Sequence, residues 1–229
     1  MEALILAAGR GERMRPLTDT CPKPLLPVRG RPLIEWHLLA LARDGVRDVV
    51  INTAWLEEQF PAALGDGSRF GLRIRYSMEG RDHGGALETA GGIATALPLL
   101  QSDTFWVVGG DVFMPDFRFD PACVTDFTAR GDLAHLWLVP NPPQHASGDF
   151  GLSQGRVVGH HETNTRYTYS GIGLYNAKLV EGVRAGERAA LRPCLDAAIA
   201  RQRIGGSLYR QEWVDVGTPQ RWQDLQGAR

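Results

Sequence analysis

A loop near the N-terminus carries the residues best suited to phosphate chemistry. The apolar run 3–6 leads into the small-residue segment 7–11 (AAGRG), and Arg13, Arg15 and Lys23 follow. Small residues let the backbone lie close to a ligand, and successive free N–H groups form a concave anion site. Guanidinium and ammonium groups add charge-assisted hydrogen bonds to phosphate oxygens. The loop therefore suits a nucleoside triphosphate.

Two familiar glycine-loop motifs do not fit this segment. The Walker loop requires Gly-Lys followed by Ser or Thr, and no such tripeptide occurs in the sequence. The dinucleotide fingerprint requires a third glycine where Met14 stands, and an acidic residue after the second strand, where the run 49–51 is followed by Asn52. Both interpretations are excluded.

Two aspartates stand where a carboxylate can face phosphate. Asp111 follows Gly109 and Gly110 at the end of an apolar run, and Asp215 lies between two valines. The alternation of an extended chain points Asp215 away from both valines. Mg²⁺ takes oxygen ligands and usually only one or two carboxylates, so the pair are candidate magnesium ligands. The competing interpretation is that each caps a helix or turn, as Asp near Gly commonly does.

Strands and helices alternate over the first half of the chain. We expect strands at 3–6, 49–51, 72–76 and 105–108, and helices at 33–41, 55–64 and 86–97. This alternation predicts an α/β fold with a Rossmann-like, mostly parallel sheet, right-handed crossovers and helices on both faces. Ligands bind beyond the carboxyl ends of such strands, so Gly9, Asn52, Glu79 and Asp111 should collect there.

The pattern changes after Asp111. We expect strands at 132–139, 150–153, 156–159, 167–175 and 207–209, and helices at 189–201 and 219–226. Several of these strands are short and joined by turns, which predicts a small antiparallel β portion packed on the same sheet. No hexapeptide repeat of a β-helix occurs.

Composition narrows the class of protein. With 229 residues and 43% hydrophobic content, the chain can bury a sizeable core. A net charge of −1 gives no reason to expect nucleic acid or a membrane surface as a partner. Three scattered cysteines fit a reducing cytosol, and no 18-residue apolar run occurs. We expect a cytoplasmic, monomeric protein.

The ordered motifs resemble a known family. Gly9-Arg10-Gly11-Glu12-Arg13 followed by Pro22-Lys23-Pro24 is similar to the G-x-G-x-R and P-K signature of the nucleotide-sugar pyrophosphorylases, or sugar-1-phosphate nucleotidyltransferases. The resemblance resumes at Gly109-Gly110-Asp111 and at the segment 213–218 (WVDVGT), so it spans nearly the whole chain. Glu12 departs from the usual Thr. The segment 12–18 (ERMRPLT) is most similar to the bacterial N-acetylmuramate α-1-phosphate uridylyltransferase branch of that family.

The resemblance implies a Mg²⁺-dependent transfer of a nucleotidyl group, UTP preferred, to a sugar 1-phosphate, N-acetylmuramic acid 1-phosphate preferred, as in peptidoglycan recycling. It implies one domain over 1–229, with a nucleotide half (about 1–111) and a sugar half (about 112–229). Arg13 and Lys23 would be catalytic, and Asp111 and Asp215 would bind the metal. The nucleotide-binding positions would be Leu6, Ala7, Ala8, Gly9, Gly11, Glu79, Gly85 and Gly110. The sugar-binding positions would be Gly148, Asp149, Glu162, Ser170 and Gly171.

The base and the sugar stay open at this point. A carboxylate only accepts hydrogen bonds, so Glu79 would take the N3–H of uracil or the N1–H of guanine. Glu79 as an ordinary solvated loop residue is the competing interpretation. Alternative activities are a mannose-1-phosphate guanylyltransferase and a glucose-1-phosphate thymidylyl- or uridylyltransferase. A non-catalytic nucleotide-sugar-binding regulator is a remoter alternative, because it would be expected to lack Lys23, Asp111 or Asp215.

Overall fold

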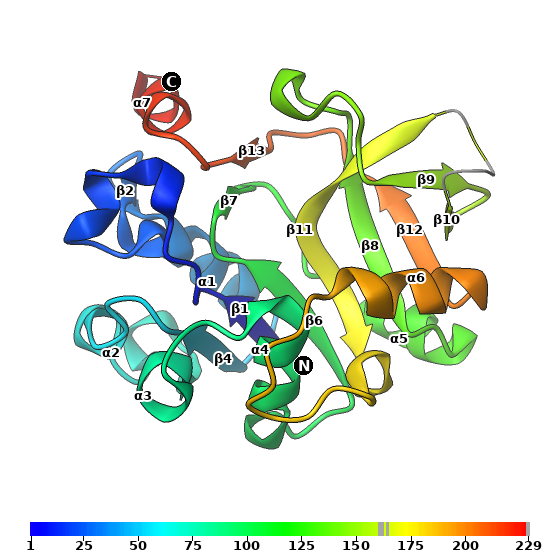
Figure 1. The fold of residues 1–229 in the computed structure, drawn as a ribbon, viewed down its shortest axis with the longest axis horizontal. Helices are drawn as coiled ribbons and strands as arrows, with labels where there is room; N and C mark the ends of the chain where they lie inside the picture. The colour runs from blue at the N-terminus through cyan, green and yellow to red at the C-terminus, as the bar shows by residue number, and fades with distance from the viewer. Residues whose placement is uncertain (160–162, 164, 228–229) are drawn as a thin grey trace.

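A mixed sheet of nine strands extends through the described part of the chain, residues 1–159, 163 and 165–227 of the computed structural model (Figure 1). In spatial order the strands are β5 (Arg73–Met78), β4 (Asp48–Thr53), β1 (Glu2–Leu6), β6 (Thr104–Gly109), β11 (Arg166–Asn176), β8 (Ala134–Val139), β12 (Ile204–Leu208), β10 (Arg156–Val158) and β9 (Phe150–Ser153). The sheet is therefore continuous between the two halves of the sequence.

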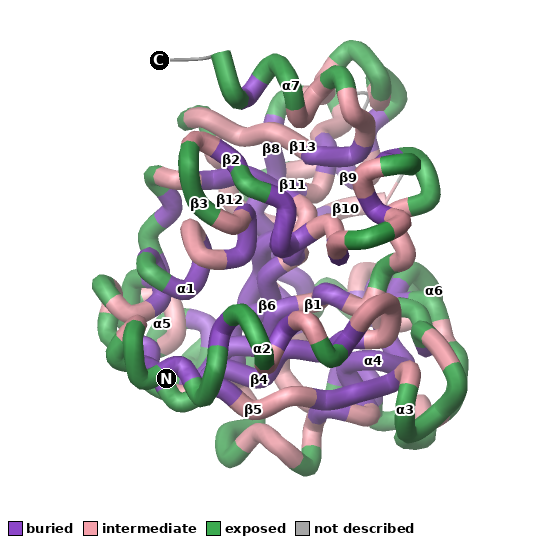
Figure 2. The backbone as a smooth tube through the Cα atoms, turned by 90° about the vertical axis from the view of Figure 1, so that its left-hand side faces the viewer, coloured by how far each residue is buried: buried purple, intermediate pink, exposed green. Residues whose placement is uncertain are grey.

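The first four strands run parallel, as the alternation predicts. β1 pairs with β4 and β6, and β4 pairs with β5, all in parallel. Parallel strands are buried on both faces, which explains their nearly continuous apolar runs. Figure 2 shows the buried stretches concentrated along these central strands. Their carboxyl ends meet at one edge, where a ligand site is expected.

Helices cover both faces of the sheet. The helices are α1 (Leu33–Arg43), α2 (Gln59–Leu64), α3 (Glu79–His83), α4 (Glu88–Ala96), α5 (Pro121–Arg130), α6 (Arg192–Ala200) and α7 (Pro219–Gly227). Ile5 of β1 packs in the same core as Ile34 of α1, whereas Leu4 packs in the opposite core with Ile93 of α4. Alternate residues of one strand thus fill two separate cores.

The second half adds the antiparallel portion. β11 runs antiparallel to both β6 and β8, β10 pairs with β9 and β12, and β12 alone returns parallel to β8. The predicted α/β fold with a small antiparallel part is confirmed.

A small third core joins distant segments beside the sheet. It contains Met14, Leu26, Phe113, Val216 and Leu225. Here the short strand β7 (Val112–Phe113) pairs with β13 (Val214–Asp215), and β2 (Pro27–Val28) pairs with β3 (Arg31–Pro32). The loop of the first half and the C-terminal segment are therefore anchored to one another.

Some element boundaries differ from the sequence prediction. α2 begins at Gln59 rather than residue 55, because Leu56 has a positive φ of 48° that no right-handed helix accommodates. α5 was not predicted, because Phe127 is its only buried residue and the apolar pattern is correspondingly weak. β12 begins earlier than expected, because Gly205 and Gly206 conceal the strand pattern.

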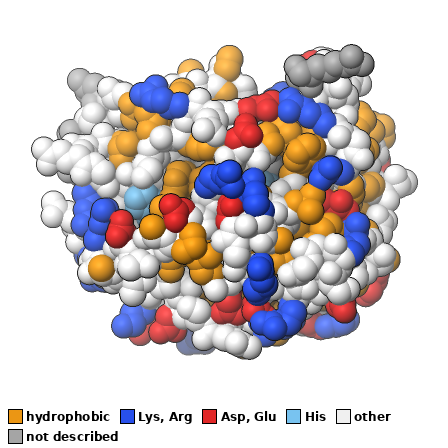
Figure 3. Space-filling view, turned by 180° about the vertical axis from the view of Figure 1, so that it is seen from behind, with side chains coloured by type: hydrophobic (Ala, Val, Ile, Leu, Met, Phe, Trp, Pro, Cys, Tyr) orange, Lys and Arg blue, Asp and Glu red, His pale blue; other side chains and the backbone are white. Residues whose placement is uncertain are grey.

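The surface carries both charges. On the face seen in Figure 3, basic and acidic side chains are interspersed around small apolar areas. Among the described residues, no helix is long and apolar enough to cross a membrane.

Candidate active site

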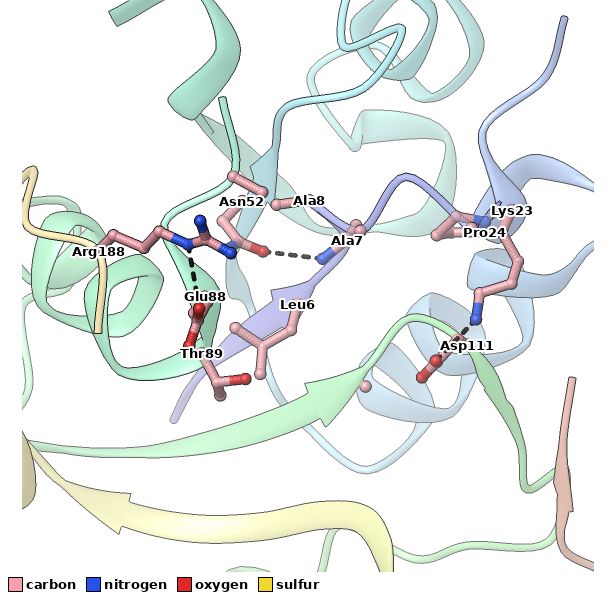
Figure 4. A pocket seen from close by; sticks show the side chains of 14 residues that line it. Leu6, Ala7, Ala8, Lys23, Pro24, Asn52, Glu88, Thr89, Asp111 and Arg188 are labelled. Carbon is pink, nitrogen blue, oxygen red and sulfur yellow. Dashed lines mark hydrogen bonds and ion pairs between the residues drawn. The ribbon is translucent and has the colours of Figure 1, made fainter. Parts of the chain in front are cut away.

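A cavity of about 410 Å³ lies at the carboxyl ends of β1, β4 and β6. This volume is in the range of small-molecule sites. The lining residues are Leu6, Ala7, Ala8, Gly9, Gly11, Lys23, Pro24, Asn52, Ala86, Glu88, Thr89, Gly109, Asp111 and Arg188. Figure 4 shows Lys23 and Asp111 at one end of the cavity and Glu88, Thr89 and Arg188 at the other. A long ligand could therefore place its phosphates at the first end.

The glycine loop is held by hydrogen bonds from its surroundings. Gly11 has φ of +68°, and a Cβ on it would lie 3.0 Å from Thr18 Cγ2, so glycine suits this close turn. The Thr18 hydroxyl donates to the Gly11 carbonyl at 2.8 Å. Arg10 is used in this scaffold, because its guanidinium donates to the Thr18 carbonyl and to Asp19. Arg15 also binds Asp19, which leaves Arg13 as the loop arginine with no such partner among the described residues.

Lys23 and Asp111 form an ion pair at the phosphate end. Lys23 Nζ lies 2.8 Å from Asp111 Oδ2. The lysine side chain is 11% exposed and the aspartate side chain 47% exposed. The carboxylate is therefore accessible from the cavity, whereas the lysine side chain is largely covered by protein. Buried Pro24 follows Lys23 in a short turn, which fixes where the lysine leaves the backbone.

Pairing of β7 with β13 brings Asp215 to Asp111. Asp215 is opposite Val112 in this pairing, and the Val216 N–H donates to the Asp111 carbonyl at 2.9 Å. The Asp215 carboxylate accepts a hydrogen bond from Arg221 Nη1 at 2.5 Å. The segments that carry the two predicted carboxylates are therefore paired with each other, although they are far apart in the sequence.

Gly217 marks where Asp215, Arg221 and Arg13 converge. A Cβ on Gly217 would lie 2.6 Å from Arg221 Nη2, 2.8 Å from Asp215 Oδ1 and 3.2 Å from Arg13 Nη2. Gly110 is similarly restricted, because its Cβ would lie 2.9 Å from the Leu6 carbonyl oxygen. Both glycines allow charged and backbone groups to approach closely.

A second cavity of about 350 Å³ adjoins Asp215. Its lining residues are Val139, Pro140, Pro142, Gln144, Arg210, Gln211, Trp213, Val214, Asp215 and Arg221. Arg210 is exposed and makes no ion pair or hydrogen bond within the described part of the chain. This compartment combines apolar walls with two guanidinium groups, so it suits an anionic organic group.

The described members of the predicted sugar-binding set do not line this compartment. Asp149 accepts the Tyr169 N–H at 2.8 Å and binds His145 Nε2 at 2.9 Å. Ser170 is fully buried, and its carbonyl accepts a hydrogen bond from the Trp213 indole at 2.9 Å. Gly148 and Gly171 have positive φ angles, and Gly171 lies within β11, where the register with β8 shifts between Tyr169 and Gly173. Glu162 lies outside the described residues.

Glu79 is not in the wall of the nucleotide-sized cavity. Its side chain is fully buried, with Oε1 accepting from Asn52 Nδ2 at 2.6 Å and Oε2 accepting from the Leu87 N–H at 2.8 Å. Burial raises its pKa above the usual value. Both carboxylate oxygens are therefore engaged by the protein, which corrects the picture of a solvated loop residue. Gly85 lines a neighbouring cavity of about 440 Å³ that shares Ala8 and Ala86 with the first.

Several lining residues were not predicted as site residues. Glu88 and Arg188 form an ion pair of 3.0 Å at the far end of the cavity, and Glu88 has φ of 60°. A positive φ in a residue other than Gly is uncommon and often accompanies function, but it leaves no sign in the sequence. Arg210 and Arg221 flank the motif that contains Asp215, and that proximity is the signal that could have identified them.

The donor set of the site fits magnesium. Within the described residues no group of three or more His, Cys, Asp or Glu side chains could hold a metal. Mg²⁺ seldom requires such a cage, because it is commonly held by one or two carboxylates and by substrate phosphates. Asp111 lines the first cavity and Asp215 the second, on segments that pair as β7 and β13, so the site offers two carboxylates of this kind.

Comparison with known proteins identifies the family of this chain. The model of the nucleotidyl transferase family matches residues 2–227. The N-acetylmuramate α-1-phosphate uridylyltransferase of Neisseria meningitidis serogroup B is 49% identical over 99% of this chain and 97% of that protein. The UTP–glucose-1-phosphate uridylyltransferase of Synechocystis is 29% identical over 100% of this chain, which spans 63% of that protein. A Bacillus anthracis structure, described provisionally as a glucose-1-phosphate thymidylyltransferase, shares the fold with a TM-score of 0.83 at 23% identity, covering 99% of this chain and 94% of that one. The chain therefore belongs to the nucleotidyl transferase family.

Proposed function

We propose that this enzyme transfers a uridylyl group from UTP to N-acetylmuramic acid 1-phosphate, which gives UDP-N-acetylmuramic acid and pyrophosphate. The observation that supports the reaction class is the ion pair of Lys23 and Asp111 at one end of a nucleotide-sized cavity, on a segment that pairs with the strand carrying Asp215. The choice of substrates is supported by the 49% identity to the Neisseria enzyme over nearly the full length of both chains.

In the proposed reaction an oxygen of the sugar phosphate attacks the α-phosphorus in line. A new O–P bond forms, the bond between the α-phosphorus and the bridging oxygen breaks, and pyrophosphate leaves with the electron pair. The nucleophile is already an anion, so no general base is needed. The barrier lies in charge repulsion and alignment, which positioned cations and backbone donors lower.

Each charged residue has a place in this scheme. Lys23 lies beside Asp111 and would bridge the α-phosphate and the sugar phosphate as they approach. Arg13 would face the departing pyrophosphate with the planar fork of its guanidinium. Asp111 and Asp215 would hold Mg²⁺, which neutralises charge on the reacting phosphates.

The second cavity provides the place for the acceptor sugar. N-acetylmuramic acid carries a lactyl carboxylate that N-acetylglucosamine lacks. In that cavity Arg210 offers a guanidinium that has no partner in the described ranges, and Trp213, Pro140 and Pro142 line the same cavity. A bidentate pair between Arg210 and the lactyl carboxylate would distinguish the two sugars.

A substrate panel tests the proposal. Pyrophosphate release is measured with UTP, dTTP or GTP against the 1-phosphates of N-acetylmuramic acid, N-acetylglucosamine, glucose and mannose. We expect the highest kcat/KM with UTP and N-acetylmuramic acid 1-phosphate, and we expect Arg210→Gln to reduce the preference over N-acetylglucosamine 1-phosphate by at least ~10-fold. A preference for GTP with mannose 1-phosphate, or for dTTP with glucose 1-phosphate, would refute the assignment of substrates.

A further inference from the structure

A buried chain of hydrogen bonds connects the phosphate loop, at Ala7, with the turn before α4, at Leu87. At one end the Ala7 N–H donates to Asn52 Oδ1 at 2.8 Å (Figure 4). Asn52 Nδ2 then donates to Glu79 Oε1 at 2.6 Å, and the Leu87 N–H donates to Glu79 Oε2 at 2.8 Å. Asn52 is 2% exposed and Glu79 is fully buried, so water does not replace these partners.

The chain of bonds reaches both walls that a nucleotide would contact. Ala7 precedes Ala8 and Gly9 of the phosphate loop, and Leu87 precedes Glu88, whose positive φ turns the chain into α4. Helix α4 packs directly against the Asn52 and Glu79 side chains at Gly92, where a Cβ would lie 2.5 Å from Asn52 Nδ2 and 2.7 Å from Glu79 Oε1. The position of one wall is therefore fixed relative to the other.

Only one orientation of the Asn52 amide satisfies this arrangement. The Ala7 N–H donates to the Asn52 backbone carbonyl at 3.1 Å as well as to Asn52 Oδ1. Because an N–H can only donate, an amide NH₂ turned toward Ala7 would place two donors in contact, so the amide oxygen lies on that side. The amide NH₂ must then point to Glu79, which has to accept there and also from the Leu87 N–H. A carboxylate is the side chain of this length with an acceptor at both places.

We propose that Glu79 and Asn52 are positioning residues that hold the phosphate loop and the turn before α4 at the spacing required by the nucleotide. This role deepens the proposed function and differs from direct reading of the base by Glu79. It depends on the direction of the hydrogen bonds and not on the negative charge of Glu79 as such.

The direction of the bonds allows a swap experiment. Glu79→Gln leaves one donor facing another: the new NH₂ meets either the Leu87 N–H or the Asn52 amide, and a flip of Asn52 moves the conflict to Ala7. Asn52→Asp places two carboxylates in contact in a buried site, where both cannot stay ionised. The double variant restores every bond, because the introduced aspartate accepts from Ala7 and from the introduced amide, whose oxygen accepts from Leu87. Its net charge equals that of the wild type.

The cycle is measured as KM and kcat at pH 8 with the NTP and sugar 1-phosphate that the wild type uses best. We expect each single variant to raise the KM for the NTP by about 10- to 100-fold, the effect of one unsatisfied buried polar group. The KM for the sugar phosphate should change by less than about 3-fold. The double variant should return the KM for the NTP to within about 3-fold of the wild type. Because the cycle uses the wild-type enzyme's own substrates, a wrong assignment of UTP would appear in the substrate panel and leave this test intact.

Glu57→Gln is the matched control. Glu57 is a buried glutamate nearby whose Oε2 accepts the Gly80 N–H at 3.0 Å, and a glutamine retains one acceptor for that bond. It should leave the KM for the NTP within about 2-fold of the wild type. The proposal would be overturned if the KM for the NTP rose in the double variant by the product of the two single-variant increases. It would also be overturned if Glu79→Gln kept the wild-type KM values. If a single variant does not fold, recovery of soluble, active double variant supports it, and failure of the double variant to fold overturns it.

Discussion

The Val216 N–H donates a 2.9 Å hydrogen bond to the carbonyl of Asp111, and this bond places Asp215 beside Asp111. Asp111 lies in the turn between β6 and β7. Asp215 belongs to the C-terminal segment, whose Val216 and Leu225 pack in the small third core beside the sheet. The geometry of the carboxylate pair thus depends on the docking of the C-terminal segment. The same segment brings Arg221 and Gly217 to the site, which makes it the part of the fold where substitutions should affect chemistry most.

Lys23→Ala should reduce kcat by about 10²-fold and should also weaken binding of the sugar phosphate. The lysine is held beside Asp111, and in the proposed reaction it would bridge the two reacting phosphates. Its charge would then be most useful in the transition state, and lost transition-state contacts appear in kcat. Steady-state kinetics with both substrates varied measures the two effects. A higher KM with unchanged kcat would show that Lys23 only binds substrate.

Arg13→Lys should cost about 2–4 kcal/mol in the chemical step, because an ammonium cannot reproduce the planar fork of a guanidinium. Single-turnover kinetics at saturating NTP isolates this step. Arg15→Lys is a comparison variant, since Arg15 is paired with Asp19 on the outside of the loop. Equal single-turnover rates for wild type and Arg13→Lys, with only the apparent NTP affinity reduced, would contradict the role given to Arg13.

Gly217→Ala should lower turnover by at least ~10-fold with little loss of thermal stability. The added Cβ would lie 2.6 Å from Arg221 Nη2 and 2.8 Å from Asp215 Oδ1, so the charged groups must move. Gly182→Ala is the control, because nothing lies within 4 Å of a Cβ on Gly182. Turnover of Gly217→Ala at the wild-type rate would mean that these groups need not stay where they converge.

Acid should destabilise the fold partly through His135. Burial lowers the pKa of His135 from 6.5 to about 4, and its Nε2 lies 2.9 Å from the Ser207 hydroxyl. Between pH 6.5 and about pH 4, His135 is therefore protonated in the unfolded chain but not in the folded chain. In this range the free energy of unfolding falls by up to about 1.4 kcal/mol for each unit by which the pH is lowered. Urea unfolding of wild type and His135→Gln between pH 7 and pH 4.5 measures the difference. His37 is buried too and stays in the variant, so the acid sensitivity should be reduced, not abolished. If the free energy of unfolding changed equally with pH in the wild type and in His135→Gln, His135 would not be a source of the acid sensitivity.

The parallel half of the fold could be predicted because its strands are apolar and its helices have a clear apolar face, as in Ile34 and Leu38 of α1. α5 could not, because a helix with one buried residue has almost no periodic signal. Lys23, Asp111 and Asp215 could be proposed as site residues from the sequence because they belong to ordered motifs, and their roles stay predictions. Glu88 and Arg188 were missed because a positive φ and long-range packing bring them to the cavity, and a linear pattern does not encode either.

The central claim is that Asp111 and Asp215 form one magnesium site, and its most direct test is the Mg²⁺ dependence of turnover in Asp111→Asn, Asp215→Asn and the double variant. EDTA should silence the wild type and Mg²⁺ should restore it. We expect each single variant to keep its melting temperature, to lose at least ~10²-fold in turnover and to need more Mg²⁺ for half-maximal activity. The double variant should lose little more than either single one, because the two carboxylates act as a unit. Near-normal turnover in Asp215→Asn at unchanged Mg²⁺ demand would contradict the account.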